Sequence, residues 1–281
     1  MQDSTVTTAG AAAIATPPAQ EVLAQSDRAG AGIAGIRNGQ TIELDRYQQS
    51  GKIELSGDTV TQDIGRGQTM QYSLSQLAAH SSDSAYLEAS LRYAAKRGES
   101  VDISVNGGVP NVTNPALEQS LPQKLPLREP VLHASVMHDL DPKLLAAVGM
   151  QETGLGTSRF YDQVTHRGDG GHGYGPFQLD DQRRNGAAGR PQAELDRAAN
   201  DPYYAADRAA GMLGHNLEQR HGDVRQALQM YNSGSPDHRG SPTDWGPSVG
   251  VLYYADSTMR HYGEIQSSLE REQAHSTEHA R

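Results

Sequence analysis

Residues 141–154 have the sequence DPKLLAAVGMQETG, and this stretch predicts a helix at the start of the chain's helical half. Asp141 is a suitable N-cap, because its carboxylate can accept hydrogen bonds from the free N–H groups of the first turn. Pro142 suits the first helical position, where no backbone N–H is needed. We therefore expect a helix that begins at Pro142 and carries the apolar residues that follow.

One carboxylic acid lies on the apolar face of this predicted helix. Leu144, Val148, Glu152 and Leu155 are spaced by four, four and three residues, and so they share one side. A carboxyl held there loses hydration, which disfavours its charged form and raises its pKa. A general acid that works near neutral pH requires such a pKa. The alternative is a glutamate at a helix end that is solvated or paired with an arginine.

A glycine-rich acidic loop follows, and its sequence over residues 168–180 is GDGGHGYGPFQLD. Glycines let the backbone turn sharply and let a bulky ligand come close. A calcium loop would need further oxygen ligands after Asp169, and a phosphate loop would need a lysine after the glycines. The remaining possibilities are a sugar-binding loop that carries carboxylates opposite Glu152, and a plain cluster of surface turns.

Two histidines near this loop raise the question of a metal site. His166, Asp169 and His172 could in principle bind a metal without thiols. The sequence has no His-Glu-x-x-His pair to anchor such a site. We therefore expect no metal and no cofactor, and we interpret the histidines as loop residues or as hydrogen-bond donors to substrate.

Composition excludes several classes of protein. The formal net charge of −10 argues against a nucleic-acid partner, which would require a basic face. There is no cysteine, so disulfides and thiol chemistry are excluded. No apolar run approaches the roughly 20 residues that a membrane-spanning helix needs. Residues 1–19 lack the basic and apolar regions of an ordinary signal peptide.

The first part of the chain predicts little regular structure. Residues 1–35 are expected to be a flexible segment, and residues 36–124 a small N-terminal region and linker for export, docking or targeting. Short alternations at residues 42–44 and 53–55 predict hairpin strands. Residues 73–96 predict a helix that Ser81–Ser84 would split. Residues 100–126 are polar and contain four prolines, which indicates a linker.

The second part of the chain predicts helices throughout. Besides the helix at Pro142, we expect helices over residues 129–140, 201–220, 223–231 and 246–262. A charged, frayed tail is expected over residues 266–281. The predicted fold is therefore mainly α, with an α-helical domain over residues 125–265 behind a small N-terminal region.

Three blocks of sequence resemble those of one enzyme family. They are Glu152-Thr153-Gly154, the loop from Gly168 to Asp180, and Met230-Tyr231-Asn232-Ser233-Gly234, in that order. The order and spacing resemble those of goose-type lysozymes and the related soluble lytic transglycosylases. The chain looks like a bacterial or phage member of that group. The resemblance covers about 130 residues, from near 130 to near 262, and it does not reach the N-terminal third.

This resemblance implies an α+β lysozyme-like domain with a small β-element at the cleft. It also implies cleavage of the β-1,4 bond between N-acetylmuramic acid and N-acetylglucosamine in peptidoglycan. The implied general acid is Glu152, and Asp169 and Asp180 match the two aspartates that hold or activate water. The residues expected to bind substrate are Gln178, Tyr231, Asn232, Tyr174 and His172.

The chain departs from the family pattern at two places. Pro176-Phe177 replaces the usual Leu-Met before the glutamine, which puts the packing of the cleft in question. Residues 245–249 stand where relatives often carry a tyrosine, so the role of that position is open. The disulfides of vertebrate members are absent, because the chain has no cysteine.

The two aspartates favour inverting hydrolysis over transglycosylation, in which the sugar's own C6 hydroxyl attacks and gives a 1,6-anhydro product. A third possibility is a non-catalytic scaffold of a phage particle or secretion apparatus. The expected partners are peptidoglycan strands, a proteinaceous lysozyme inhibitor or immunity protein, and a secretion-apparatus component. The expected place of action is the bacterial cell wall or periplasm, reached by secretion or a specialised delivery system.

Overall fold

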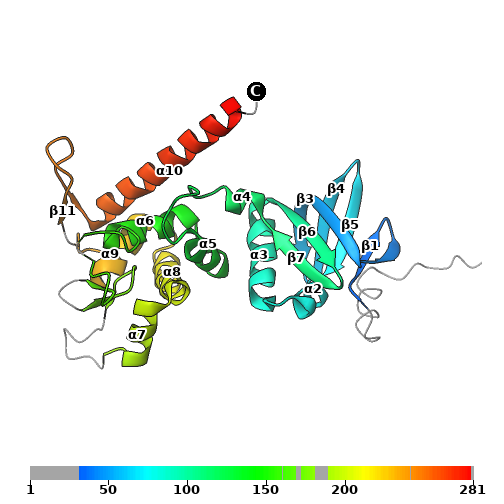
Figure 1. Ribbon diagram of the computed structural model, residues 1–281, viewed down its shortest axis with the longest axis horizontal. Helices are drawn as coiled ribbons and strands as arrows, with labels where there is room; N and C mark the ends of the chain where they lie inside the picture. The colour runs from blue at the N-terminus through cyan, green and yellow to red at the C-terminus, as the bar shows by residue number, and fades with distance from the viewer. Residues whose placement is uncertain (1–31, 160, 169–171, 181–188, 241, 280–281) are drawn as a thin grey trace, which may run out of the picture.

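The structure is a computed structural model that describes residues 32–159, 161–168, 172–180, 189–240 and 242–279. The chain is 46% helix and 24% strand. A large antiparallel sheet forms one half of the molecule, and a group of helices forms the other (Figure 1). The expectation of a mainly α fold is therefore wrong, and the protein has a mixed α/β fold.

The sheet has seven strands in the order β2-β1-β5-β4-β3-β6-β7, and all neighbours are antiparallel. The strands are β1 (Ala34–Arg37), β2 (Gln40–Glu43), β3 (Arg46–Ser56), β4 (Thr59–Gly65), β5 (Gln68–Ser73), β6 (Ser100–Asn106) and β7 (Val109–Thr113). Of the two segments predicted to be hairpin strands, residues 42–44 overlap the end of β2, and residues 53–55 lie within β3. Short turns that contain glycine join β1 to β2, β3 to β4, β4 to β5 and β6 to β7.

The long strand β3 changes partners along its length. Residues 46–52 pair with β6, whereas residues 53–56 pair with β4. A Cβ at Gly51 would lie 1.7 Å from the carbonyl oxygen of Asp63, so only glycine allows the backbones to approach so closely there. Gln62 is fully buried at this split, and its Nε2 donates to the carbonyl oxygens of Gln49 (3.2 Å) and Val101 (2.9 Å).

Two helices pack against the sheet, namely α2 (Leu74–His80) and α3 (Ser84–Arg97). The predicted split between them is confirmed, because Ser73 and Asp83 each cap a separate helix with a side-chain oxygen. The buried core between helices and sheet contains fourteen side chains: Ile33, Leu44, Ile53, Val60, Met70, Tyr72, Leu74, Leu77, Leu87, Leu91, Ala94, Val101, Ile103 and Val105.

The segment over residues 100–126 is not a simple linker. Its first part forms the hairpin of β6 and β7, and α4 (Pro115–Glu118) follows. The prolines misled the interpretation, since Pro110 lies on the edge strand β7 and Pro115 begins α4, both of which tolerate proline. The alternation of buried Val101, Ile103 and Val105 with polar residues is the strand signal that the prolines obscured.

The second half contains α5 (Arg128–Met137), α6 (Pro142–Thr153), α7 (Gln192–Asn200), α8 (Pro202–Gln219), α9 (Val224–Ser233) and α10 (Tyr254–His279). Helix α10 packs on α6 and α9, and α8 packs on α5 and α9. The helix predicted to begin at Pro142 is confirmed. So are the helices predicted over residues 129–140, 201–220 and 223–231. Helix α7 was not predicted.

The prediction for the C-terminal part is wrong in two ways. Residues 242–253 form a hairpin of β11 (Pro242–Asp244) and β12 (Val251–Tyr253), which stands out from the helices in Figure 1. The segment expected to be frayed continues α10 as far as His279. The glycines at 246 and 250, both with positive φ, make the turn of this hairpin.

The two halves meet through α3. The carboxylate of Asp139 binds both Lys96 and Arg97 (2.5 Å to Arg97 Nη1), and the Tyr93 hydroxyl donates to the carbonyl oxygen of Leu140 at 3.2 Å. The Tyr86 ring of α3 also stacks on the ring of His133 in α5, with 4.6 Å between centroids. The end of α3 therefore holds the loop from which α6 begins.

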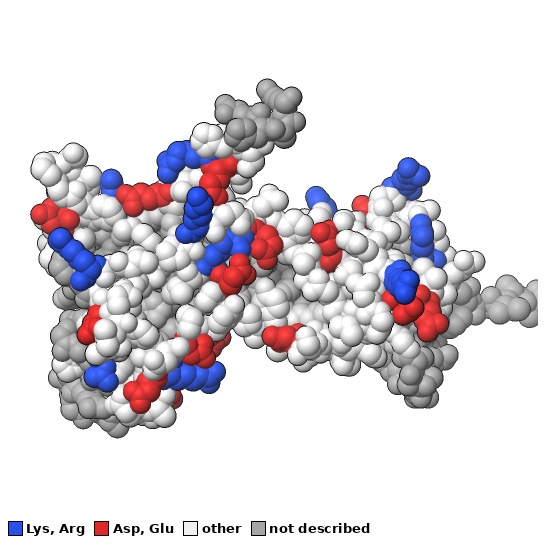
Figure 2. Space-filling model, viewed as in Figure 1, with Lys and Arg blue, Asp and Glu red and all other residues white. Residues whose placement is uncertain are grey.

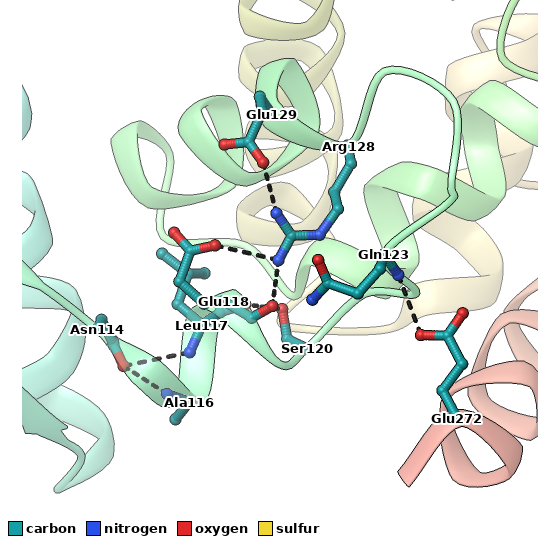
Figure 3. Close-up of polar contacts among 9 residues, drawn as sticks. All are labelled: Asn114, Ala116, Leu117, Glu118, Ser120, Gln123, Arg128, Glu129 and Glu272. Carbon is teal, nitrogen blue, oxygen red and sulfur yellow. Dashed lines mark hydrogen bonds and ion pairs between the residues drawn. The ribbon is translucent and has the colours of Figure 1, made fainter. Parts of the chain in front are cut away.

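A buried arginine fixes the connection between the halves. Arg128, 9% exposed, binds Glu129 Oε1 at 2.5 Å, Glu118 Oε2 at 3.1 Å and the carbonyl oxygen of Glu118 (Figure 3). The backbone N–H of Gln123 donates to Glu272 of α10 at 3.1 Å (Figure 3). The connecting segment is thus attached to the start of α5 and to the far part of α10.

On the face drawn in Figure 2, acidic and basic side chains are interspersed over both halves. Within the described ranges, no helix is both long enough and apolar enough to cross a membrane.

Candidate active site

Helix α6 carries Glu152 in its last turn. The side chain of Asp141 accepts from the N–H of Lys143 at 2.9 Å, Pro142 occupies the first turn, and Gly154 ends the helix with φ of 62°. Both caps follow from local sequence chemistry. Glu152 is half-buried, whereas Leu144 is nearly covered. The spacing predicts the acid on the apolar face, and the structure places it there only half-buried, in the last turn of the helix.

The segment from the glycine-rich loop packs directly against α6. A Cβ at Gly149 would lie 2.9 Å from Cε1 of Phe177 and 2.4 Å from Cδ2 of Leu155, so the glycine makes room for both side chains. Thr153 fixes the same segment, because its hydroxyl donates to the carbonyl oxygen of Pro176 at 2.6 Å. Pro176 and Phe177 are buried and thus belong to the packing under the site.

Tyr254 contacts the acid directly. Its hydroxyl donates to Oε1 of Glu152 at 2.5 Å, and its ring is only 2% exposed at the start of α10. Burial, followed by the negative charge of Glu152, raises the pKa of Tyr254 well above its ordinary value. The phenol therefore keeps its proton at any physiological pH, and it holds one carboxyl oxygen of Glu152 in a fixed place.

Tyr231 is a second phenol that is influenced by the charge of Glu152. It is half-buried, and its hydroxyl donates to the carbonyl oxygen of Phe177 at 3.1 Å. Burial and then the charge of Glu152 raise the pKa of Tyr231 well above its ordinary value, and the positive charge of Arg190 opposes this. Because Tyr231 also raises the pKa of Tyr254, the two phenols and Glu152 form one electrostatic group.

Asn232 follows Tyr231 at the end of α9 and is exposed. A Cβ at Gly240 would lie 2.5 Å from Oδ1 of Asn232 and 2.7 Å from Cβ of Tyr254. Gly240 thus leaves the space where a Cβ would stand to Asn232 and Tyr254. The structure therefore brings Glu152, Tyr231, Asn232 and Tyr254 into one region.

A small three-stranded sheet carries the other predicted residues. Its strands are β8 (Arg167–Gly168), β9 (Gly173–Tyr174) and β10 (Leu179–Asp180), in the order β10-β9-β8. Tyr174 is buried, with the Arg167 guanidinium 4.5 Å from its ring centroid. Tyr174 therefore belongs to the packing of the sheet rather than to an open binding surface.

Gln178 also serves this sheet. Its Nε2 donates to the carbonyl oxygen of Gly175 at 2.9 Å, and its φ is 49°. A Cβ at Gly168 or at Gly173 would lie 2.2 Å from its Oε1. The two glycines therefore leave room for the amide, which lies across the sheet.

The remaining predicted residues lie around the loop. His172 and Asp180 are exposed, and Arg190 Nε donates to the carbonyl oxygen of Asp180 at 3.1 Å. Asp169 lies outside the described residues. His166 Nδ1 is 2.7 Å from the carbonyl oxygen of Ala199, which fits a structural histidine. No group of three or more His, Cys, Asp or Glu side chains suited to a metal ion occurs in the part of the chain that the structure describes.

The sequence interpretation missed Tyr254 and the residues that hold the adjacent hairpin. The Ser257 hydroxyl donates to Gln151 Oε1 at 2.5 Å and accepts from Trp245 Nε1 at 2.8 Å. Gln151 Nε2 donates to the hydroxyl of Thr243 at 3.1 Å. The residue just before the acid thus ties α6 to the β11–β12 hairpin and to α10.

No protein-family model matches this chain, and no curated protein matches it significantly. The chemistry of the site must therefore be argued from its own residues. A half-buried carboxyl that accepts a hydrogen bond from a buried phenol is held in a fixed orientation, which is one requirement for a group that exchanges a proton with substrate.

Proposed function

We propose that the protein is a peptidoglycan hydrolase, a muramidase that cleaves the β-1,4 bond between N-acetylmuramic acid and N-acetylglucosamine. The observation that carries this proposal is the 2.5 Å hydrogen bond from the buried Tyr254 hydroxyl to Glu152. It holds one carboxyl oxygen of Glu152 in a fixed place and so limits rotation of the acid. The three sequence blocks that resemble goose-type lysozymes include both Glu152 and Tyr231.

In this proposal Glu152 protonates the bridging oxygen as the glycosidic bond breaks. Asp169 or Asp180 activates a water on the opposite face of the sugar, which inverts the anomeric centre. Inverting enzymes place the two carboxyls roughly 6.5–9.5 Å apart, which leaves space for the water. Tyr231 and Asn232 contact the sugar beside the acid. The exposed positions of Asn232, His172 and Asp180 are compatible with contact to a polymer.

The proposed setting follows from the substrate. The enzyme acts at the bacterial cell wall or periplasm, after secretion or specialised delivery, and the sheet half serves export, docking or targeting. An immunity protein or lysozyme inhibitor that fills the site would protect the producing cell, and a secretion-apparatus component is the second proposed partner.

Mass spectrometry of the products tests the proposal. Purified cell walls digested by the wild-type protein should give muropeptides with free reducing ends. Asp180→Asn should slow this digestion about 10²-fold if Asp180 is the base, since general-base groups contribute roughly 10²–10⁴. 1,6-Anhydro products with an unaffected Asp180→Asn variant would identify a lytic transglycosylase instead. A wild-type protein with no products at all would favour a non-catalytic scaffold.

A further inference from the structure

Arg190 is a mostly buried arginine that connects the small sheet to the helices. Its side chain is 13% exposed, just before α7. Its Nε donates to the carbonyl oxygen of Asp180 at 3.1 Å, and its Nη2 lies 3.6 Å from the sulfur of Met212 in α8. The guanidinium therefore joins the end of β10 to α8.

The charge of Arg190 also acts on Tyr231. Burial and then the charge of Glu152 raise the pKa of Tyr231, whereas the positive charge of Arg190 lowers it. Charge interactions weaken with distance, so Arg190 and Glu152 both lie within electrostatic reach of the same phenol. One side chain thus contacts the strand that carries Asp180 and acts on the group that contains the acid.

The contacts of Arg190 are weak ones for a buried charge. Its Nη1 lies 3.9 Å from Oε2 of Glu194, in the first turn of α7, whereas charge-assisted hydrogen bonds measure about 2.7–2.9 Å. Glu194 is also shared with Arg208 of α8, at the same 3.9 Å. A buried charge is costly unless it is closely paired. Stability alone therefore gives little reason for a guanidinium at this position.

The strand that Arg190 contacts is short and lies at an edge. Strand β10 has two residues, is the outermost strand of the small sheet, and pairs with β9 through Asp180 and Gly173. A pairing of this length has little stability by itself. The bond from Arg190 supplies a second attachment. Because it is made to the backbone oxygen of Asp180, it orients this residue without occupying its carboxylate.

We propose that Arg190 is a positioning residue for Asp180, the second carboxylate of the proposed reaction. It holds the end of β10 in place relative to Tyr231 and Glu152. The carboxylate of Asp180 then takes a proton from a water whose oxygen bonds to the anomeric carbon. Glu152 gives its proton to the bridging oxygen, and the glycosidic bond breaks. This inference rests on the proposed function, and it selects Asp180 over Asp169 as the base.

A double-mutant cycle between Arg190→Met and Asp180→Asn tests this role. Methionine keeps apolar packing and removes the charge and the donors. Arg190→Met should lower kcat on a soluble muropeptide oligomer about tenfold with little change in KM, because a misplaced catalytic group can cost up to roughly 10²-fold. In the Asp180→Asn background the same change should cost less than about twofold, since the group that Arg190 positions is already lost.

Arg208→Met is the matched control, because Arg208 approaches the same Glu194 at the same distance but is 43% exposed. It should keep the wild-type kcat. Arg190→Lys keeps the charge and one donor group, so it should recover part of the kcat that Arg190→Met loses. Thermal unfolding of each variant shows that the rates belong to folded protein.

Two results would overturn the proposal on kinetic grounds. One is a wild-type kcat in Arg190→Met, and the other is an equal loss in both backgrounds, which is what a merely structural arginine would give. An active wild type that Asp180→Asn does not slow would also overturn it, although the hydrolase would then stand.

Hydrogen–deuterium exchange separates this inference from the proposed function, because it needs no substrate. The backbone amides of residues 173–180 should exchange faster in Arg190→Met than in the wild type or Arg208→Met. If the wild type cleaves no wall glycan, the hydrolase fails, and faster exchange would still support Arg190 as the residue that holds β10. Equal exchange in the three proteins would overturn the positioning role whatever the activity.

Discussion

Each half of the molecule buries a tyrosine with a raised pKa, and the two differ in what the hydroxyl meets. In the sheet, Tyr72 is fully buried and donates to Gln62 at 2.7 Å, and burial, followed by the hydrogen bond with Tyr47, raises its pKa. Gln62 in turn bonds two backbone carbonyls. In the helical half, Tyr254 donates to Glu152, which is half-buried.

The difference distinguishes structure from chemistry. The network around Tyr72 consists of neutral groups, and its amide satisfies the backbone where β3 changes partners. The network around Tyr254 ends on an ionisable carboxyl that reaches solvent. A buried network of neutral groups stabilises a fold, whereas a network that ends on an accessible acid can also move a proton. Substitutions in the network around Tyr72 should therefore lower stability and leave activity unchanged. Substitutions in the network around Tyr254 should lower activity and leave stability unchanged.

The largest expected effect is that of Glu152→Gln. Loss of the transferable proton should lower wall digestion about 10³-fold or more, with an unchanged thermal unfolding temperature. Turbidity of a cell-wall suspension measures the rate, and circular dichroism measures unfolding. Glu218→Gln is the matched control, since Glu218 is an exposed glutamate of α8. A Glu152→Gln variant as active as the wild type would refute the assignment of the acid.

Tyr254→Phe should have the next largest effect, because it keeps the buried ring and removes only the hydrogen bond to the acid. We expect kcat to fall about 10²-fold, which corresponds to about 2.7 kcal/mol, with little change in KM. Initial rates on a soluble muropeptide oligomer separate the two constants. A rise in KM alone would show that Tyr254 binds sugar rather than positions Glu152.

The sheet provides the converse test. Gln62→Leu removes the side-chain donor to the carbonyls of Gln49 and Val101 and one of the two partners of the Tyr72 hydroxyl, so the free energy of unfolding should fall by about 2 kcal/mol. The rate of wall digestion by the folded protein should not change. Urea unfolding measures the loss, and Gln48→Leu on the exposed side of β3 is the control. A stable Gln62→Leu protein with reduced activity would contradict the comparison between the halves.

The smallest expected effect concerns the contact between the halves. Burial raises the pKa of Asp139, but hydrogen bonds and charges of Lys96 and Arg97 outweigh it and lower the pKa overall. Because this pKa is lowered, the ionised Asp139 stabilises the fold at pH values above its unfolded pKa of about 4. That stabilisation is lost as pH falls through the pKa of Asp139 in the folded protein.

Because Asp139 is partly exposed, we expect Asp139→Asn to destabilise the protein by only about 0.5 kcal/mol at pH 7. The difference from the wild type should vanish at pH values below the folded pKa. Urea unfolding at pH 7 and at pH 3 tests this. A difference that grows at low pH would have the wrong sign.

Local signals in the sequence predicted the parts of the fold that local chemistry decides. Asp141 and Pro142 begin α6 as expected, and the break between α2 and α3 follows from Ser81–Ser84. The sheet was underestimated because prolines and glycines in its turns and edge strand resembled a linker. Its strand order depends on pairings such as that of β1 with β5, which no local pattern encodes.

The same limit applies to the candidate site. Spacing alone placed Glu152 on the apolar face, because helical periodicity is local, but it could not show that the side chain is only half-buried. Tyr254 was missed because its contact with Glu152 spans 102 residues. The doublet Tyr253-Tyr254 before a helix was the available signal, but it does not show which phenol is buried. The exposure of Asn232 and the position of Gln178 across the small sheet likewise depend on tertiary contacts.

Helix α10 begins with the tyrosine that orients the acid and, eighteen residues later, carries the glutamate bound to the connecting segment. At 1.5 Å per residue these two points are about 27 Å apart along one continuous rod. A rod of this kind transmits displacement with little loss. The connecting segment and the phenol beside Glu152 are therefore attached to the two ends of one rigid element.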